Sequence, residues 1–107
     1  GMNYYDPAIA AVWFQTGDVT AVAAQAAQSA ALTGLLGVLY GLSVTPVADV
    51  FGAFESTNVT LGGGGVPVNV QRICQWTWMC AGEPHGPDIH ANSDGYGVIA
   101  RAFLPHL

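Results

Sequence analysis

The spacing of apolar residues predicts two helices in the N-terminal half of the chain. The first follows Asp6-Pro7 and ends at Gly17, because aspartate caps a helix, proline fits its first turn and glycine ends it. The second begins at Asp18 or Thr20 and ends at Gly41. Its apolar face combines one line of side chains with an adjoining line of leucines: Val22, Ala26, Ser29, Thr33, Leu36 and Tyr40, then Leu32, Leu35 and Leu39.

Two further helices are predicted in the C-terminal half. One runs from Asn69 to Trp78, and one of its faces carries Val70, Ile73, Cys74 and Thr77. The other is capped by Asn92 or Ser93 and ends at Pro105. Its apolar stripe has the i, i+3, i+4, i+7 spacing and consists of Tyr96, Ile99, Ala100 and Phe103.

Two short segments predict strands. Met2 to Tyr5 is typical of the end of a strand. Val44 to Val50 is rich in β-branched residues and apolar on both faces, as in a parallel strand that is covered on both sides. The order strand, helix, strand, helix is typical of an α/β protein, and a chain of 107 residues allows one small domain.

Composition adds an expectation about partners. Charged residues make up only 8% of the chain and hydrophobic residues 51%, so a small domain has few charges to cover its surface. We therefore expect the protein to hide surface in an assembly rather than to be a well-behaved monomer. The net charge of -5 argues against nucleic acid as a partner. The uncharged stretch between Asp18 and Asp49 is rich in alanine and broken by glycines and polar residues, which favours a buried helix over a membrane span.

Cys74 and Cys80 are the only cysteines. An even number of cysteines in a lysine-poor chain suits a disulfide in an exported protein, and two reduced, buried thiols are the alternative. Together with His85 and His90 they also form a series of four potential metal ligands. The spacing of that series matches no established zinc motif, so a Cys/His metal-binding domain is a minor alternative.

His90 is the candidate for chemistry. It lies on a loop immediately before the last predicted helix, where a histidine is held rigidly and stays accessible to substrate. A general base needs this geometry, and an ordinary loop histidine is the alternative. His106 is in the last three residues and is interpreted as part of a solvated end.

The segment from Pro87 to Phe103 resembles the last conserved block of the SGNH (GDSL-type) ester hydrolases. That block places the catalytic histidine just before the final helix, followed by Asn, then Gly-Tyr and an Ile-Ala pair; here these are His90, Asn92, Gly95-Tyr96 and Ile99-Ala100. Two other segments resemble the secreted, actinobacterial-like branch of the family: Gly1 to Pro7, and Cys74 to Cys80 with Trp76-Thr77-Trp78-Met79.

The resemblance implies a fold and an activity. The implied fold is α/β: a partial flavodoxin-like three-layer fold with a short parallel sheet, in which residues 1–107 form a single domain equivalent to the C-terminal half of such a hydrolase. A partner or another copy would complete that sheet. The implied activity is hydrolysis of small-molecule or lipid carboxylic esters by a secreted enzyme, with no cofactor and no metal.

The resemblance also assigns catalytic roles. His90 takes the proton of a serine nucleophile. Asp88 is the candidate for orienting His90, although the family's usual Asp-x-x-His pattern puts the carboxylate at the position of Pro87. A backbone carbonyl near Pro87 is the alternative for that role.

The sequence departs from the family in lacking the Gly-Asp-Ser nucleophile block, the oxyanion glycine and the Gly-x-Asn-Asp block. None of the four serines replaces the nucleophile: Ser29, Ser43, Ser56 and Ser93. We therefore expect the chain to be nearly inert alone. It would act in a complex with an N-terminal nucleophile-bearing segment or as a homo-oligomer. The alternative from another class is a non-catalytic, oligomerising remnant of such a hydrolase.

Overall fold

Every regular element of the chain is helical. The computed structural model describes all 107 residues and contains five α-helices, two short 3-10 helices and no β-strand. The α-helices are α1 (Ala8–Thr16), α2 (Val19–Leu42), α3 (Val50–Ala53), α4 (Val68–Trp76) and α5 (Ser93–Phe103), and the 3-10 helices are Gly63–Gly65 and Leu104–His106. The prediction of an α/β, flavodoxin-like fold is therefore wrong, and there is no sheet for a partner to complete.

The turn between α1 and α2 forms as its residues predict. Asp6 accepts a hydrogen bond at 2.9 Å from the backbone N–H of Ala8, the first residue of α1, although the N-cap position itself is Pro7. Gly17 takes the left-handed conformation at φ 59°, and its N–H donates to Trp13, which ends α1. Asp18 then caps α2 by accepting from the backbone N–H of Thr20 at 2.9 Å. Local residues thus set three of the four ends of the first two helices.

The two predicted strands lie beside each other but share only one bridge, a parallel pairing of Met2 with Ala48. Side chains take over the bonds that a ladder would make. The amide of Asn3 donates to Asp49 at 2.9 Å and accepts from the backbone N–H of Phe51 at 2.7 Å. Asp49 also caps α3, so the chain turns into a helix at Val50, where the strand was predicted to end.

The segment from Val44 to Pro46 is also unfit for a ladder. Val44 has a positive φ of 55°, which interrupts an extended backbone, and Pro46 has no N–H to donate. A strand apolar on both faces needs cover on both sides, and Val44 is 89% exposed.

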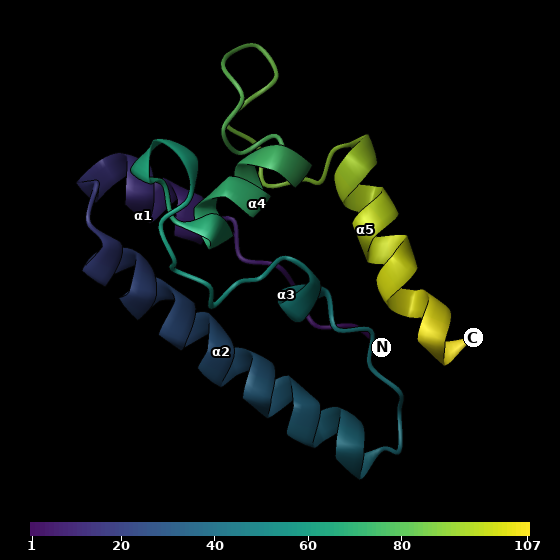
Figure 1. Cartoon of the computed structure of the whole chain (residues 1–107). Coiled ribbons are helices and arrows are strands. Elements are labelled where there is room, and N and C mark those ends of the chain that lie inside the picture. The colour runs from purple at the N-terminus through teal and green to yellow at the C-terminus, as the bar shows by residue number, and fades with distance from the viewer.

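Helix α2 packs against α1 by its N-terminal half only. Val22 and Ala26 are buried, at 0% and 4% exposure, as predicted for the inward line of this helix. Beyond them the helix runs along one side of the molecule, while α5 lies on the opposite side (Figure 1). The adjoining line of leucines was predicted as part of an apolar face, and it faces solvent: Leu32, Leu35 and Leu39 are 61–64% exposed. Leu42, which was not part of that prediction, is 79% exposed. The helix also ends at Leu42, one residue beyond the predicted cap at Gly41.

Helix α4 lies between α1 and α5 and carries much of the core. Val70 and Ile73 are fully buried on the face that the sequence predicted, and Thr77 follows them on the same face. The core cluster consists of Ile9, Ala10, Val22, Ala26, Val50, Phe54, Val70, Ile73 and Val98. It joins all five helices, because each helix contributes at least one residue to it. Helix α3 contributes Val50, and Phe54 is the C-cap residue of the same helix.

Helix α5 meets the core with a face shifted from the predicted one: Ile99 of the predicted stripe packs against the core, together with Val98 and Ala102 from outside that stripe. Gly95 and Val98 are buried, whereas Tyr96, in the predicted apolar stripe, is 57% exposed. The reason is a close approach of two backbones: a Cβ atom at Gly95 would lie 1.9 Å from the carbonyl oxygen of Trp76. A stripe of large side chains could not approach so closely.

Candidate active site

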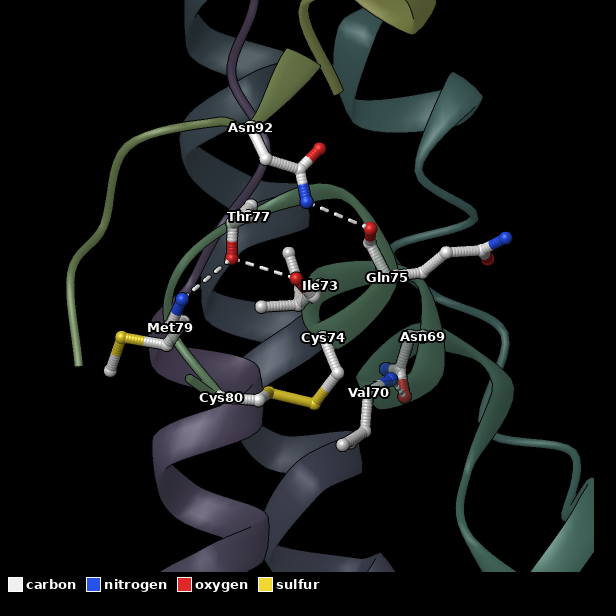
Figure 2. Close-up of a disulfide and its surroundings, with 9 residues drawn as sticks. All are labelled: Asn69, Val70, Ile73, Cys74, Gln75, Thr77, Met79, Cys80 and Asn92. Atoms are coloured by element: carbon white, nitrogen blue, oxygen red, sulfur yellow. Dashed lines mark hydrogen bonds between the residues drawn. A yellow bond between two sulfur atoms is a disulfide. The ribbon is translucent and has the colours of Figure 1, made fainter. Parts of the chain in front are cut away.

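A disulfide closes the chain on itself at the end of α4. Cys74 and Cys80 are bonded, as the sequence predicted, and the alternative of two free thiols is wrong. Inside this ring the hydroxyl of Thr77 donates to the carbonyl of Ile73 at 2.7 Å and accepts from the backbone N–H of Met79 at 3.1 Å (Figure 2). The segment after α4 is therefore a fixed platform rather than a free loop. A disulfide of this kind fits an extracellular protein.

The alternative metal site does not form. Two of its four ligands are the disulfide cysteines, which have no thiolate to offer. No group of three or more histidine, cysteine, aspartate or glutamate side chains comes together in a way that could hold a metal ion. His85 instead packs its ring against Trp78, with 5.4 Å between the ring centroids.

Removing the disulfide is expected to destabilise the fold by about 2 kcal/mol, since a crosslink over so short a loop restricts the unfolded chain only modestly. The double variant Cys74→Ser/Cys80→Ser would be compared with the wild type by urea denaturation followed by circular dichroism. The single variant Cys74→Ala in the presence of reductant is the control for burial of the sulfur. A double variant with unchanged stability would contradict the expectation.

The loop that carries the candidate residues is tied to this platform. Trp78 donates its backbone N–H to the carbonyl of His90 at 3.0 Å, and its own carbonyl accepts from the N–H of Asp88 at 3.2 Å. Thr77 and Ala91 form an antiparallel bridge beside these bonds. Asp88 and His90 are thus held on one edge by the disulfide ring.

Asn92 fixes the other end of the loop. Its side-chain oxygen accepts from the N–H of Gly95 at 2.9 Å and caps α5, as predicted. Its amide donates to the carbonyl of Gln75 at 2.9 Å (Figure 2). Its backbone N–H donates to the carbonyl of Trp76 at 3.0 Å. One side chain therefore joins the start of α5 to the end of α4, directly after His90.

Asp88 and His90 are in direct contact. One carboxylate oxygen of Asp88 lies 2.5 Å from Nδ1 of His90 and also accepts from the backbone N–H of His90 at 2.9 Å. The side chain of His90 is 70% exposed and that of Asp88 is 42% exposed. The short spacing between the two residues is therefore no obstacle, and the carboxylate itself holds the ring. With the Nδ1 proton directed at Asp88, Nε2 is left with a free lone pair.

Hydrogen bonds hold the pKa of the Asp88 carboxyl below its ordinary value of 3.8; the backbone N–H of His90 is the larger cause and its ring the second. Because the pKa of Asp88 is lower in the folded chain than in the unfolded chain, the ionised carboxylate stabilises the fold at pH values above its ordinary pKa. This stabilisation is lost as the pH falls through the lowered pKa of the folded chain. We expect the backbone amide resonance of His90 to shift with a midpoint below pH 3.8 in an NMR titration. Asp88→Asn should remove that step, and a midpoint at or above 3.8 would contradict the contact.

No serine of the chain hydrogen-bonds to His90. Ser29 donates to the carboxylate of Asp6, and Ser56 is buried and donates to the carbonyl of Phe51 at 2.7 Å. Ser43 bonds to residues at the end of α2, and Ser93 is the exposed first residue of α5. The structure brings together a base and an acid, and none of the four serines makes the third contact.

One contact of the site has no signal in the sequence. The hydroxyl of Tyr5 donates to the carbonyl of Ile89 at 2.8 Å, although the two residues are 84 positions apart. Tyr5 also lines a groove of about 420 Å³ between the N-terminal segment and α2, beside Tyr4, Asp6 and Leu32. Only the folded chain brings this tyrosine to the loop of Asp88 and His90.

Helix α2 has a second property that bears on location. It is long and apolar enough to cross a membrane by length and composition, with a mean hydropathy of 1.4 in its most apolar stretch. An N-terminal apolar helix of this kind is also typical of a signal sequence.

Comparison with known protein families, with curated proteins and with solved structures finds no match to this chain.

Proposed function

We propose that this chain supplies the catalytic base of a secreted carboxylic ester hydrolase of the SGNH type. The observation that carries this proposal is the pair formed by Asp88 and His90, in contact at 2.5 Å on a loop that two anchored segments hold at the surface. The segment around this pair is also the part of the sequence that resembles the family. The overall fold gives the proposal no support.

The chemistry assigned to the pair is proton transfer. Nε2 of His90 takes the proton of a serine hydroxyl while the serine oxygen attacks the ester carbonyl, and the imidazolium then gives the proton to the departing alcohol. A water molecule, activated by the same nitrogen, hydrolyses the acyl-enzyme. Asp88 stays ionised throughout, orients the ring and stabilises the imidazolium.

The serine would come from a second polypeptide segment that carries a Gly-Asp-Ser block. The substrate class is uncharged esters, since the two arginines are not at the pair: Arg72 is bound to Glu55 at 2.9 Å, and Arg101 lies in the last turn of α5. Secretion is supported by the disulfide.

The test is reconstitution of activity. The chain would be co-expressed with the polypeptide encoded directly upstream of it, and p-nitrophenyl acetate and butyrate would be offered as substrates. We expect turnover, together with covalent labelling of one serine by a fluorophosphonate probe, only when both polypeptides are present. The absence of any Gly-Asp-Ser polypeptide encoded beside the chain or bound to it would overturn the proposal.

A second candidate function is self-association without catalysis, and the exposed leucines of α2 favour it. Leu32, Leu35, Leu39 and Leu42 follow the alternating three- and four-residue spacing of a coiled-coil seam. No charged residue lies on α2, so two copies of this face would meet without repulsion. The occupant of this seam would be the same helix of a second copy.

We expect the wild-type chain to elute with a mass above its monomer mass of 11.1 kDa when light scattering follows size-exclusion chromatography. Leu39→Glu should shift it to the monomer, because a charge in a buried seam is costly. Ala27→Glu is the matched control, since it places the same charge at an exposed position of α2 away from the leucine line. A monodisperse wild-type monomer would contradict self-association.

A further inference from the structure

The ring of Tyr5 is fixed by aromatic packing. It stacks on Phe54 with 4.6 Å between the ring centroids and an angle of 15° between the planes. Phe54 is fully buried and in turn meets Trp76 edge-on at 5.1 Å. A side chain held in this way presents its hydroxyl at one place, with little freedom to follow a moving loop.

That hydroxyl lies against the segment that carries the catalytic pair. It donates to the carbonyl of Ile89, the residue between Asp88 and His90. The side chain of Ile89 is 58% exposed, so the core does not anchor this residue through its side chain. Burial raises the pKa of the Tyr5 hydroxyl, and the nearby Tyr96 and Asp88 raise it further, against a smaller lowering by the backbone N–H of Ala91. Tyr5 is therefore protonated, and able to donate, throughout the neutral range.

The backbone bonds that hold this loop involve Asp88 and His90, whereas the carbonyl of Ile89 is bonded to the hydroxyl of Tyr5. Trp78 holds the N–H of Asp88 and the carbonyl of His90. The peptide group between Ile89 and His90 carries both the N–H that bonds Asp88 and the carbonyl that Tyr5 holds. Rotation of this one peptide would remove the backbone bond to Asp88 and leave the carboxylate held by the ring of His90 alone.

We propose that Tyr5 is a positioning residue that locks the peptide between Ile89 and His90 and thereby keeps Asp88 against Nδ1 of His90. This role rests on the proposed function as far as catalysis is concerned, whereas the lock itself is a property of the chain alone. It joins the N-terminal segment to a site that otherwise belongs wholly to the last third of the chain.

The test compares Tyr5→Phe, which removes only the hydroxyl, with Tyr4→Phe. Tyr4 is the neighbouring tyrosine, is 57% exposed and makes no hydrogen bond through its hydroxyl. The first readout is the two-bond ¹H–¹⁵N spectrum of the His90 ring in the chain alone. We expect one tautomer, with the proton on Nδ1, in the wild type and in Tyr4→Phe, and a mixture of tautomers in Tyr5→Phe. A single tautomer in Tyr5→Phe would overturn the lock.

The second readout is the kinetics of the reconstituted hydrolase. Tyr5→Phe should lower kcat by about 10- to 100-fold with KM unchanged, because a misplaced base affects proton transfer more than substrate binding. If His90→Ala leaves the activity intact, the proposed function fails. If His90→Ala abolishes activity and Tyr5→Phe does not lower it, only the role of Tyr5 fails.

A measurement on the wild-type chain covers the case in which Tyr5→Phe does not fold. The hydroxyl proton of Tyr5 should exchange with water at least tenfold more slowly than that of Tyr4, since it is hydrogen-bonded to the carbonyl of Ile89. Equal exchange rates for the two hydroxyl protons would overturn the lock.

Discussion

His90→Ala is expected to lower kcat of the reconstituted ester hydrolase by about 10⁶-fold, the usual cost of removing the base from a serine-histidine pair. The physical reason is that an un-ionised serine hydroxyl is a poor nucleophile and no other group in the chain stands ready to take its proton. Asp88→Asn should cost about 10⁴-fold, because an amide in place of the carboxylate favours the wrong tautomer of the ring. The measurement is the initial rate with p-nitrophenyl butyrate, followed over a range of pH.

His85→Ala is the matched control for this pair of variants. His85 lies on the same Gly- and Pro-containing loop and is exposed, but its ring packs on Trp78 and has no contact with Asp88. Its loss should leave kcat within about twofold of the wild type, within the range of an ordinary surface change. Equal losses in His85→Ala and His90→Ala would mean that the effect comes from disturbance of the loop rather than from the base.

Gly95→Ala is expected to destabilise the protein by about 3 kcal/mol, a large part of the stability of a small domain. The added methyl group would lie 1.9 Å from the carbonyl oxygen of Trp76, so α5 would have to move away from the end of α4. That movement would also stretch the bonds of Asn92 to Gln75 and Trp76. The measurement is urea denaturation, with the slope checked for two-state unfolding.

Gly97→Ala tests the same substitution two residues further along the same helix. Its methyl group would meet only the flexible end of Arg101, at 3.4 Å. Because alanine favours a helix over glycine by about 1 kcal/mol, this variant should be neutral or stabilising. The outcome that would contradict the close approach of α4 and α5 is a loss of stability in Gly97→Ala as large as in Gly95→Ala.

Local signals in the sequence predicted the helices better than the strands. Asp18, Gly17 and Asn92 act within a few residues of themselves, and each ends or begins a helix as expected. A strand depends on partners elsewhere in the chain. Met2 and Ala48 do meet, but the side chains of Asn3 and Asp49 satisfy the nearby backbone before a ladder can form. Hydrophobic pattern alone carries no information about that competition.

The faces of the helices were predictable only where the packing was ordinary. The apolar face of α4 is buried as its spacing indicates. In α5 the contact with α4 is made through Gly95, a residue that no hydrophobic pattern selects, so the buried face was predicted only in part, through Ile99. The exposed leucines of α2 are a second example. Their spacing places them on one face of the helix, but it does not predict whether that face is buried or exposed to solvent.

The sequence proposes the residues of the candidate site but not the contacts that support them. His90 is proposed from its place before a capped helix, and Asp88 from the resemblance of its segment to the SGNH block, one residue away from the family's usual position. Their contact depends on the shape of a loop whose anchors come from Trp78 and Tyr5. Tyr5 is separated from the loop by nearly the whole chain, and one sequence contains nothing that pairs the two.

Trp78 lies inside the disulfide ring, so the ring supports the loop that carries Asp88 and His90. The two backbone bonds that hold Asp88 and His90 both come from Trp78, which lies between Cys74 and Cys80. A chain whose cysteines are reduced has no such ring, so the segment of Trp78 is held by hydrogen bonds alone, among them those of Thr77 to Ile73 and Met79. Formation of the disulfide would then strengthen the support of the loop that carries Asp88 and His90, and we expect their contact to be less populated in the reduced chain.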